Sequence, residues 1–164
     1  MAARILVAGI GNIFLGDDGF GSEVVRHAEI PQGGVRIVDY GIRGMHLAYD
    51  LLEGWDTLVL VDAVPNRGNP GMLHVFQADH DSWPGATALD AHSMDPEAVF
   101  ASLRALGGTP PYTVVVGCEA ASVEEGIGLS DPVAEAVPRA MRAVEEIVAA
   151  LQMPPDRTSA REEC

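Results

Sequence analysis

The chain has 164 residues, enough for one domain that folds without disulfide or metal staples. Its formal net charge of -14, from 24 acidic and 10 basic residues, disfavours binding to nucleic acid, whose phosphates would be repelled. The two cysteines, Cys118 and Cys164, lie far apart with no CxxC spacing, which argues against a disulfide framework and favours a reducing cytoplasm. Neither a signal-peptide core nor a membrane-spanning apolar stretch is present, so we expect a soluble protein.

The first part of the chain alternates predicted strands and helices. Residues 4–8 form a short apolar run that enters a glycine turn, as a buried strand does. Residues 18–28 carry apolar side chains at helical spacing, with Asp17 and Asp18 near the helix N-terminus, where carboxylates interact favourably with the helix dipole. Residues 35–38 are predicted as a second strand.

The middle of the chain contains the clearest strand. A predicted helix over 45–52 precedes an uninterrupted apolar run over 57–61 that ends at Asp62. Such runs are expected where helices cover both faces of a parallel sheet. Residues 72–76 are predicted as a further strand, antiparallel or at an edge because a Pro-Gly pair precedes it.

The second half begins with an acidic segment of little periodicity. We predict, in order, an exposed connection over 79–94 that leads to His92, a helix from Asp95 or Pro96 to about Leu106, a strand over 113–116, a turn over 117–119, and a long amphipathic helix over 131–151. Pro138 lies inside this last helix, where proline can introduce a kink. The polar tail over 154–164 is predicted to be disordered.

This alternation predicts an α/β fold with a mostly parallel sheet between helical layers. No internal repeat or interdomain linker is found, so we expect a single domain over residues 1–153.

Acidic residues follow several predicted strands. In open α/β sheets ligands bind at the carboxyl ends of the strands, and Asp39, Asp62 and the Asp17-Asp18 pair all fall there. If His92 joins them, two carboxylates and one imidazole would suit a divalent cation and leave a coordination position open. The alternative interpretation is that each aspartate forms a turn or caps a helix, and that His92 is a surface residue.

Standard catalytic and nucleotide-binding motifs are missing. The segment Gly9-x-Gly11-x-x-Phe14 lacks the third glycine of a dinucleotide-binding turn, and two aspartates follow where a pyrophosphate needs positive potential. There is no Walker A loop, Gly-x-Ser-x-Gly elbow or HExxH motif. Cys118 has no evident partner histidine and is interpreted as a small buried residue. The other histidines show no metal-pair spacing and are assigned to surface or packing positions: His27, His46, His74 and His80.

The string Gly9-Ile-Gly-Asn-Ile-Phe-Leu-Gly-Asp-Asp-Gly-Phe-Gly21 resembles the opening signature of the hydrogenase maturation protease family. Further segments resemble later motifs of that family in the same order, namely residues 39–44, 60–64, 91–94 and 116–119. The resemblance covers about residues 4–151. Tyr40 departs from it, since many members have glycine there, and so does Ile42, where many have threonine.

The resemblance implies a three-layer α/β/α sandwich with a twisted central sheet. It also implies an endopeptidase that removes a short C-terminal peptide from the large-subunit precursor of a nickel-iron hydrogenase after nickel insertion. The family's proposed metal ligands fall on Asp18, Asp62 and His92. An aspartate thought to matter for function falls on Asp39, for which we expect a catalytic role. Asp17 replaces Asp18 as a ligand if the loop register differs by one.

The nickel ion is expected to arrive with the precursor, and another divalent cation can substitute for it. We expect one of two roles for nickel. Either it polarises the scissile carbonyl or activates a water molecule, or it serves only as the feature by which the protease recognises a nickel-loaded precursor. Two alternatives stay open: a metal-dependent hydrolase of small molecules, and a noncatalytic nickel-sensing chaperone of the precursor. The acidic surface is expected to guide the protein toward a basic patch on its partner.

Overall fold

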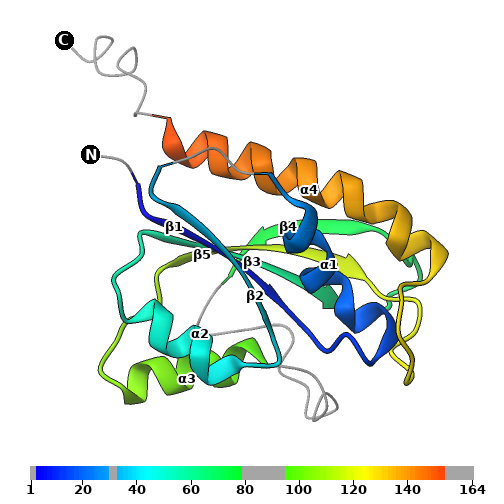
Figure 1. Cartoon of the computed structure of the whole chain (residues 1–164), viewed down its shortest axis with the longest axis horizontal. Helices are drawn as coiled ribbons and strands as arrows, with labels where there is room; N and C mark the ends of the chain where they lie inside the picture. Colours follow the sequence, from blue (N-terminus) through cyan, green and yellow to red (C-terminus); the bar gives the residue numbers. More distant parts are fainter. Residues whose placement is uncertain (1–2, 30–32, 79–94, 154–164) are drawn as a thin grey trace.

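The computed structural model describes residues 3–29, 33–78 and 95–153, and Figure 1 shows their arrangement. In chain order the elements are β1 (Ile5–Ile10), the short 3-10 helix η1 (Gly16–Gly19), α1 (Phe20–His27), β2 (Val35–Gly41), α2 (Gly44–Leu51), β3 (Thr57–Val64), β4 (Leu73–Gln77), α3 (Pro96–Ala105), β5 (Tyr112–Glu119) and α4 (Asp131–Gln152). The predicted α/β fold is confirmed.

One five-stranded sheet forms the centre of the molecule, in the order β2-β1-β3-β5-β4. All neighbouring strands are parallel except β4, which pairs antiparallel with β5 at one edge. The prediction of an edge or antiparallel strand at 72–76 is therefore confirmed. The chain runs outward from β1 to β2 and returns on the other side of β1 as β3, so the order reverses between β1 and β3.

Helices cover both faces of the sheet, as the continuous apolar strands predict. On the face covered by α1 and α4, residues such as Val7, Val59 and Val116 pack against those helices. On the face covered by α2 and α3, Leu6, Leu60 and their neighbours form a second cluster. These surfaces are called the α1/α4 face and the α2/α3 face below. The three-layer architecture is thus confirmed.

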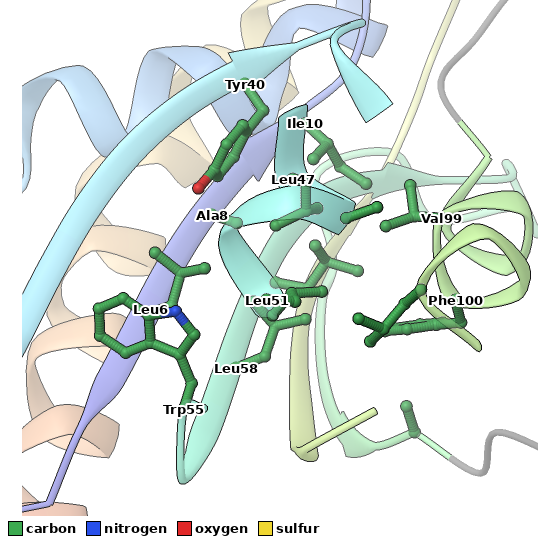
Figure 2. Close-up of a cluster of buried hydrophobic side chains, with 14 of the residues drawn as sticks. Leu6, Ala8, Ile10, Tyr40, Leu47, Leu51, Trp55, Leu58, Val99 and Phe100 are labelled. Carbon is green, nitrogen blue, oxygen red and sulfur yellow. The ribbon is translucent and has the colours of Figure 1, made fainter. Parts of the chain in front are cut away.

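Tyr40 belongs to the hydrophobic cluster on the α2/α3 face, as Figure 2 shows. The side chain is fully buried, and its hydroxyl donates a hydrogen bond of 2.5 Å to Asp50 Oδ2 on α2. Burial, together with the neighbouring Asp50 carboxylate, raises the pKa of the Tyr40 phenol far above its usual range. The departure from the family pattern therefore places an aromatic anchor between β2 and α2.

Several strands extend further than predicted, among them β1, which continues through Gly9 to Ile10. β2 continues through Asp39 to Gly41, and β3 continues through Asp62 to Val64 instead of ending at Asp62. The turn predicted over 117–119 is wrong, because these residues belong to β5 and pair in register with residues 62–64 of β3. The cause is nonlocal, since the neighbouring strand supplies the backbone hydrogen bonds that keep a polar or glycine-containing end extended.

The helix predicted over 18–28 begins as the tighter η1, and the regular α1 starts only at Phe20. The long helix predicted near the C-terminus is confirmed as α4, which continues through Pro138. The predictions of a connection over 79–94 and of a disordered tail over 154–164 lie outside the described residues. Among the described helices, none is both long and apolar enough to cross a membrane.

Candidate active site

The aspartates predicted from the sequence gather at the carboxyl end of the sheet. Asp62 lies in the last part of β3, and Asp18 lies in η1, which follows β1 and packs against β3. This is where the strand order reverses, and crevices at such switch points bind ligands in open α/β sheets. The topology therefore places two carboxylates from distant segments at the expected ligand-binding edge.

Glycines in the opening motif allow η1 and α1 to approach the strand ends. A side chain at Gly21 would place its Cβ 2.2 Å from the Val61 carbonyl oxygen, and one at Gly11 would reach within 1.9 Å of the Asp18 carbonyl oxygen. Gly11 also has a φ of 129°, which side-chain-bearing residues rarely adopt. The glycines serve close backbone packing that positions Asp18, and the interpretation as a dinucleotide-binding turn is unnecessary.

Asp17 and Asp18 are both nearly buried, 1% and 7% exposed, but they make different contacts. The Asp17 carboxylate accepts hydrogen bonds from the backbone N–H groups of Ala121, Ser122 and Ser130 and from the Ser130 hydroxyl, at 2.7 to 3.1 Å. Asp18 Oδ2 accepts a hydrogen bond of 2.7 Å from the backbone N–H of Asn12, in its own loop. Asp17 therefore fastens the segment after β5, and its oxygens are engaged there.

The pKa of Asp17 shows which of two opposing effects prevails. Burial alone raises the pKa of a carboxyl group, but hydrogen bonds from Ser130, Ser122 and Ala121 stabilise the charged form, and the pKa is lowered from 3.8. The carboxylate thus stays ionised at neutral pH in a nearly buried position, as a structural anion would.

Asp39 is fastened to α1. Its Oδ1 accepts a hydrogen bond of 2.6 Å from the hydroxyl of the buried Ser22 and another of 3.1 Å from the backbone N–H of Gly41. Side chains alternate between the faces of a strand. Asp39 follows Ile37 on the α1/α4 face, whereas Asp62 follows Leu60 on the α2/α3 face. The two carboxylates share the edge of the sheet but leave it on opposite faces.

The predicted ligand His92 lies outside the described residues, so its position relative to Asp18 and Asp62 stays a prediction. Within residues 3–29, 33–78 and 95–153, no group of three or more His, Cys, Asp or Glu side chains gathers as a metal site would require.

A histidine–glutamate pair that the sequence analysis missed lies on the same face as Asp62. Glu119, at the end of β5, is 1% exposed and contacts His74 Nε2 at 2.7 Å through Oε2. Its Oε1 accepts hydrogen bonds from the backbone N–H groups of Arg67 and Asn69, in the loop that follows β3. The His74 hydrogen bond, with those backbone bonds, lowers the pKa of Glu119. The glutamate thus holds the loop that follows Asp62.

The ring of His74, which the sequence assigns to a surface or packing position, is partly exposed and contacts the Glu119 carboxylate. In the register of the sheet, Gly117 of β5 pairs with Asp62 on one side and with His74 on the other. A signal for the pair was present, since Glu119 is an acidic residue after an apolar run, but its partner can be located only from the antiparallel pairing of β4.

Cys118 is fully buried on the α1/α4 face, which confirms its interpretation as a packing residue. Burial, followed by the nearby Asp17 charge, raises the pKa of its thiol to about 11. A thiol of this kind is protonated at neutral pH and is a poor nucleophile.

Comparison with known proteins identifies the family. The profile of the HycI family, described as hydrogenase maturation protease, matches residues 22–147. The hydrogenase 2 maturation protease of Escherichia coli is 33% identical over 153 residues, which cover 91% of each chain. The hydrogenase expression/formation protein HupD of Bradyrhizobium diazoefficiens is 34% identical over 140 residues, covering 82% of this chain and 72% of HupD.

Solved structures agree with this assignment. The hydrogenase maturating endopeptidase HybD from Escherichia coli superposes with a TM-score of 0.72 at 30% identity, covering 90% of this chain and 93% of HybD. The [NiFe] hydrogenase maturation protease HycI from Thermococcus kodakarensis has a TM-score of 0.72 at 25% identity, covering 90% of this chain and 94% of HycI.

The three-layer α/β/α fold of this chain is shared with solved hydrogenase maturation endopeptidases. The chain belongs to the hydrogenase maturation protease family. It is an endopeptidase, and it processes the C-terminus of a hydrogenase large subunit.

Proposed function

We propose that the substrate is a large-subunit precursor of a nickel-iron hydrogenase that already carries its nickel ion, and that Asp18, Asp62 and His92 bind this ion. The observation that supports the proposal is that η1, which carries Asp18, packs against β3, which carries Asp62, at the switch point of the sheet. Asp17, the alternative to Asp18, is occupied by four hydrogen bonds to residues 121–130.

The chemistry of the donor set fits a substrate-borne divalent cation. Two carboxylates and one imidazole suit a borderline ion, and they leave coordination positions for ligands that the precursor supplies. His92 precedes α3 by a few residues in the sequence, and α3 covers the face on which Asp62 lies. Another divalent cation can substitute for nickel at these side chains.

The nickel ion, when bound, supplies Lewis acidity to the scissile carbonyl or to an attacking water, an effect worth several kcal/mol in typical metal sites. The protein contributes orientation. The Asn12 N–H holds one oxygen of Asp18, the continuous register with β5 holds the backbone at Asp62, and Glu119 holds the loop that follows. Preorganised ligands of this kind keep the peptide bond close to the ion.

Asp39 is proposed to act as a positioning residue. Its bond to Ser22 joins the end of β2 to α1, the helix that follows Asp18 directly. Replacement of Asp39 by Asn, or of Ser22 by Ala, should therefore lower the cleavage rate in the same way. An effect of Asp39→Asn that far exceeds that of Ser22→Ala would instead indicate direct contact with substrate.

The test is cleavage of nickel-loaded and nickel-free precursor, with the products measured by mass spectrometry. We expect cleavage of the loaded form only. Asp18→Asn, Asp62→Asn and His92→Ala should each reduce the rate by about 100-fold or more, since a few kcal/mol of transition-state stabilisation corresponds to that factor. Glu135→Gln, on the exposed surface of α4, is the matched control and should cleave normally.

Two results would change this proposal. Release of the peptide at the wild-type rate by Asp62→Asn and His92→Ala would remove the metal role of these residues. Equal cleavage of loaded and nickel-free precursor would show that the ion is not what the protein recognises.

A cytoplasmic location is part of the same proposal. It is supported by the free thiol at Cys118 and by the scarcity of cysteine, as in proteins of reducing compartments. The net charge of -14 supports an encounter with a basic patch on the precursor and disfavours nucleic acid as a partner.

A further inference from the structure

A groove lies between two loops beside the candidate site. One loop follows β1 and the other follows β5, and Figure 1 shows the blue and yellow segments side by side at one end of the molecule. The groove has a volume of about 650 Å³ and is lined by Asn12, Phe14 and Leu15 of the first loop and by Val123, Glu125 and Ile127 of the second. This size is typical of ligand-binding pockets.

The walls of this loop groove are held together by backbone hydrogen bonds. Gly126 donates its N–H to the Phe14 carbonyl and accepts from the N–H of Gly16, both at 2.9 Å, and a short parallel bridge joins Leu15 to Gly126. Asp17 adds its four hydrogen bonds to the same segment. The groove is therefore part of the folded architecture, and the nearly buried Asp17 carboxylate is one of its supports.

The surface of the loop groove is apolar with a negative charge. Phe14 is 61% exposed, Val123 49% and Ile127 80%, so three large apolar side chains project into solvent close together. Clusters of this kind mark interaction sites on folded proteins. Glu125 lines the groove, and Glu124 is its neighbour in the chain. Within the described part of the chain, neither carboxylate forms an ion pair with a cationic side chain.

The loop groove is linked to the candidate site through Asn12. This residue lines the groove, and its backbone N–H donates to Asp18 Oδ2 at 2.7 Å. If the nickel-bearing body of the precursor sits over Asp18 and Asp62, the polypeptide that continues past the scissile bond is the part of the substrate that can enter the groove. Its surface suits apolar side chains together with a basic one opposite Glu125.

We propose that the loop groove binds the C-terminal extension of the precursor. Apolar side chains of the extension pack against Phe14 and Ile127, and a basic side chain of the extension pairs with Glu125. This rests on the proposed function. In this arrangement Asp18 and Asp62 bind the nickel-bearing body of the precursor, and the loop groove binds the peptide that leaves after cleavage. The released extension should then remain a weak competitive inhibitor of the reaction, because its contacts in the groove survive the cut.

The experiment uses a precursor that the wild-type protein cleaves and a synthetic peptide with the sequence of the released extension. The double variant Phe14→Ser/Ile127→Ser should raise KM about tenfold and weaken inhibition by the peptide by a similar factor, because central apolar contacts dominate recognition. The turnover number kcat should change little. Val75→Ser, at an exposed valine of the edge strand β4 that does not line the groove, is the matched control.

The charge is tested separately by Glu125→Lys, with Glu135→Lys on α4 as its control. Only the first should weaken peptide inhibition, and added salt should reduce the difference between them. All these positions are exposed, so unchanged melting temperatures are expected and are measured for each variant.

Distinct results separate the failure of the two proposals. If the wild-type protein cleaves no loaded precursor, the proposed function falls and the groove assignment falls with it. If the wild-type protein cleaves but the double variant has an unchanged KM and peptide inhibition, only the groove assignment is overturned. A wild-type dimer that the double variant converts to a monomer, with KM unchanged, would show that the groove binds a second copy of this chain.

Discussion

Replacement of Asp17 by Asn should destabilise the fold, although the two side chains have nearly the same shape. The carboxylate accepts four hydrogen bonds from Ala121, Ser122 and Ser130, three on Oδ2 and one on Oδ1. An amide can present one carbonyl oxygen to three of these donors. Its NH₂ group then faces the remaining N–H, and the charge is lost from every bond.

The size of the effect follows from the difference between charged and neutral hydrogen bonds. A bond to a charged group contributes about 1.5–3 kcal/mol and a neutral one about 1 kcal/mol. Three weakened bonds and one lost bond, partly offset by the easier burial of a neutral group, give a destabilisation of about 3 kcal/mol. For a domain of this size, the melting temperature should fall by about 6–12 °C.

Acid should remove this difference. The pKa of Asp17 is lowered in the folded protein relative to 3.8, so its stabilising effect is complete above pH 3.8 and is lost as the pH falls through the folded pKa. Urea unfolding of the wild type and of Asp17→Asn, at neutral pH and at several values below pH 4, measures the difference in their free energies of unfolding. Other acidic groups titrate in both proteins and cancel in the difference. Equal unfolding midpoints at neutral pH, or a difference that grows in acid, would refute the structural role of Asp17.

Three further predictions concern the packing around the site. Gly21→Ala should destabilise the protein by about 3 kcal/mol or more, because the new Cβ would lie 2.2 Å from the Val61 carbonyl oxygen. Urea unfolding measures this loss, and an unchanged unfolding midpoint would contradict the close approach. Glu119→Gln should speed amide hydrogen exchange at Arg67 and Asn69, since their acceptor loses its charge, whereas exchange in the distant α4 should not change. Alkylation of the folded protein at pH 8 should leave Cys118 unmodified, because its pKa is about 11 and its side chain is buried, and mass spectrometry of peptides containing Cys118 would reveal any labelling.

The succession of strands and helices could be predicted because it depends on local patterns. The apolar run over 57–61 predicts a strand covered on both faces, and Leu58 to Val61 do alternate between two buried clusters. The amphipathic spacing before the C-terminal tail predicts α4 in the same way. Strand ends were predicted too short, since the extension of β3 and β5 depends on pairing between residues far apart in the chain.

The candidate site could be predicted only in part. The position of aspartates after strands located Asp39 and Asp62 at the correct edge, because parallel strands bring their carboxyl ends together. The sequence could not show that Asp39 and Asp62 leave the sheet on opposite faces, since that requires the true lengths and the register of both strands. Nor could it pair His74 with Glu119, which are joined by the antiparallel contact between β4 and β5.

By itself the sequence determined the class of fold, the family and the segments that carry the acidic residues, because these depend on short-range periodicity and on motifs. Only the tertiary structure separated Asp17 from Asp18, two identical neighbours. The first meets donors contributed by residues 121–130, more than a hundred positions away, and the second meets the N–H of its own loop. The difference lies in the partners that the fold brings to each carboxylate, and those partners are distant in the chain.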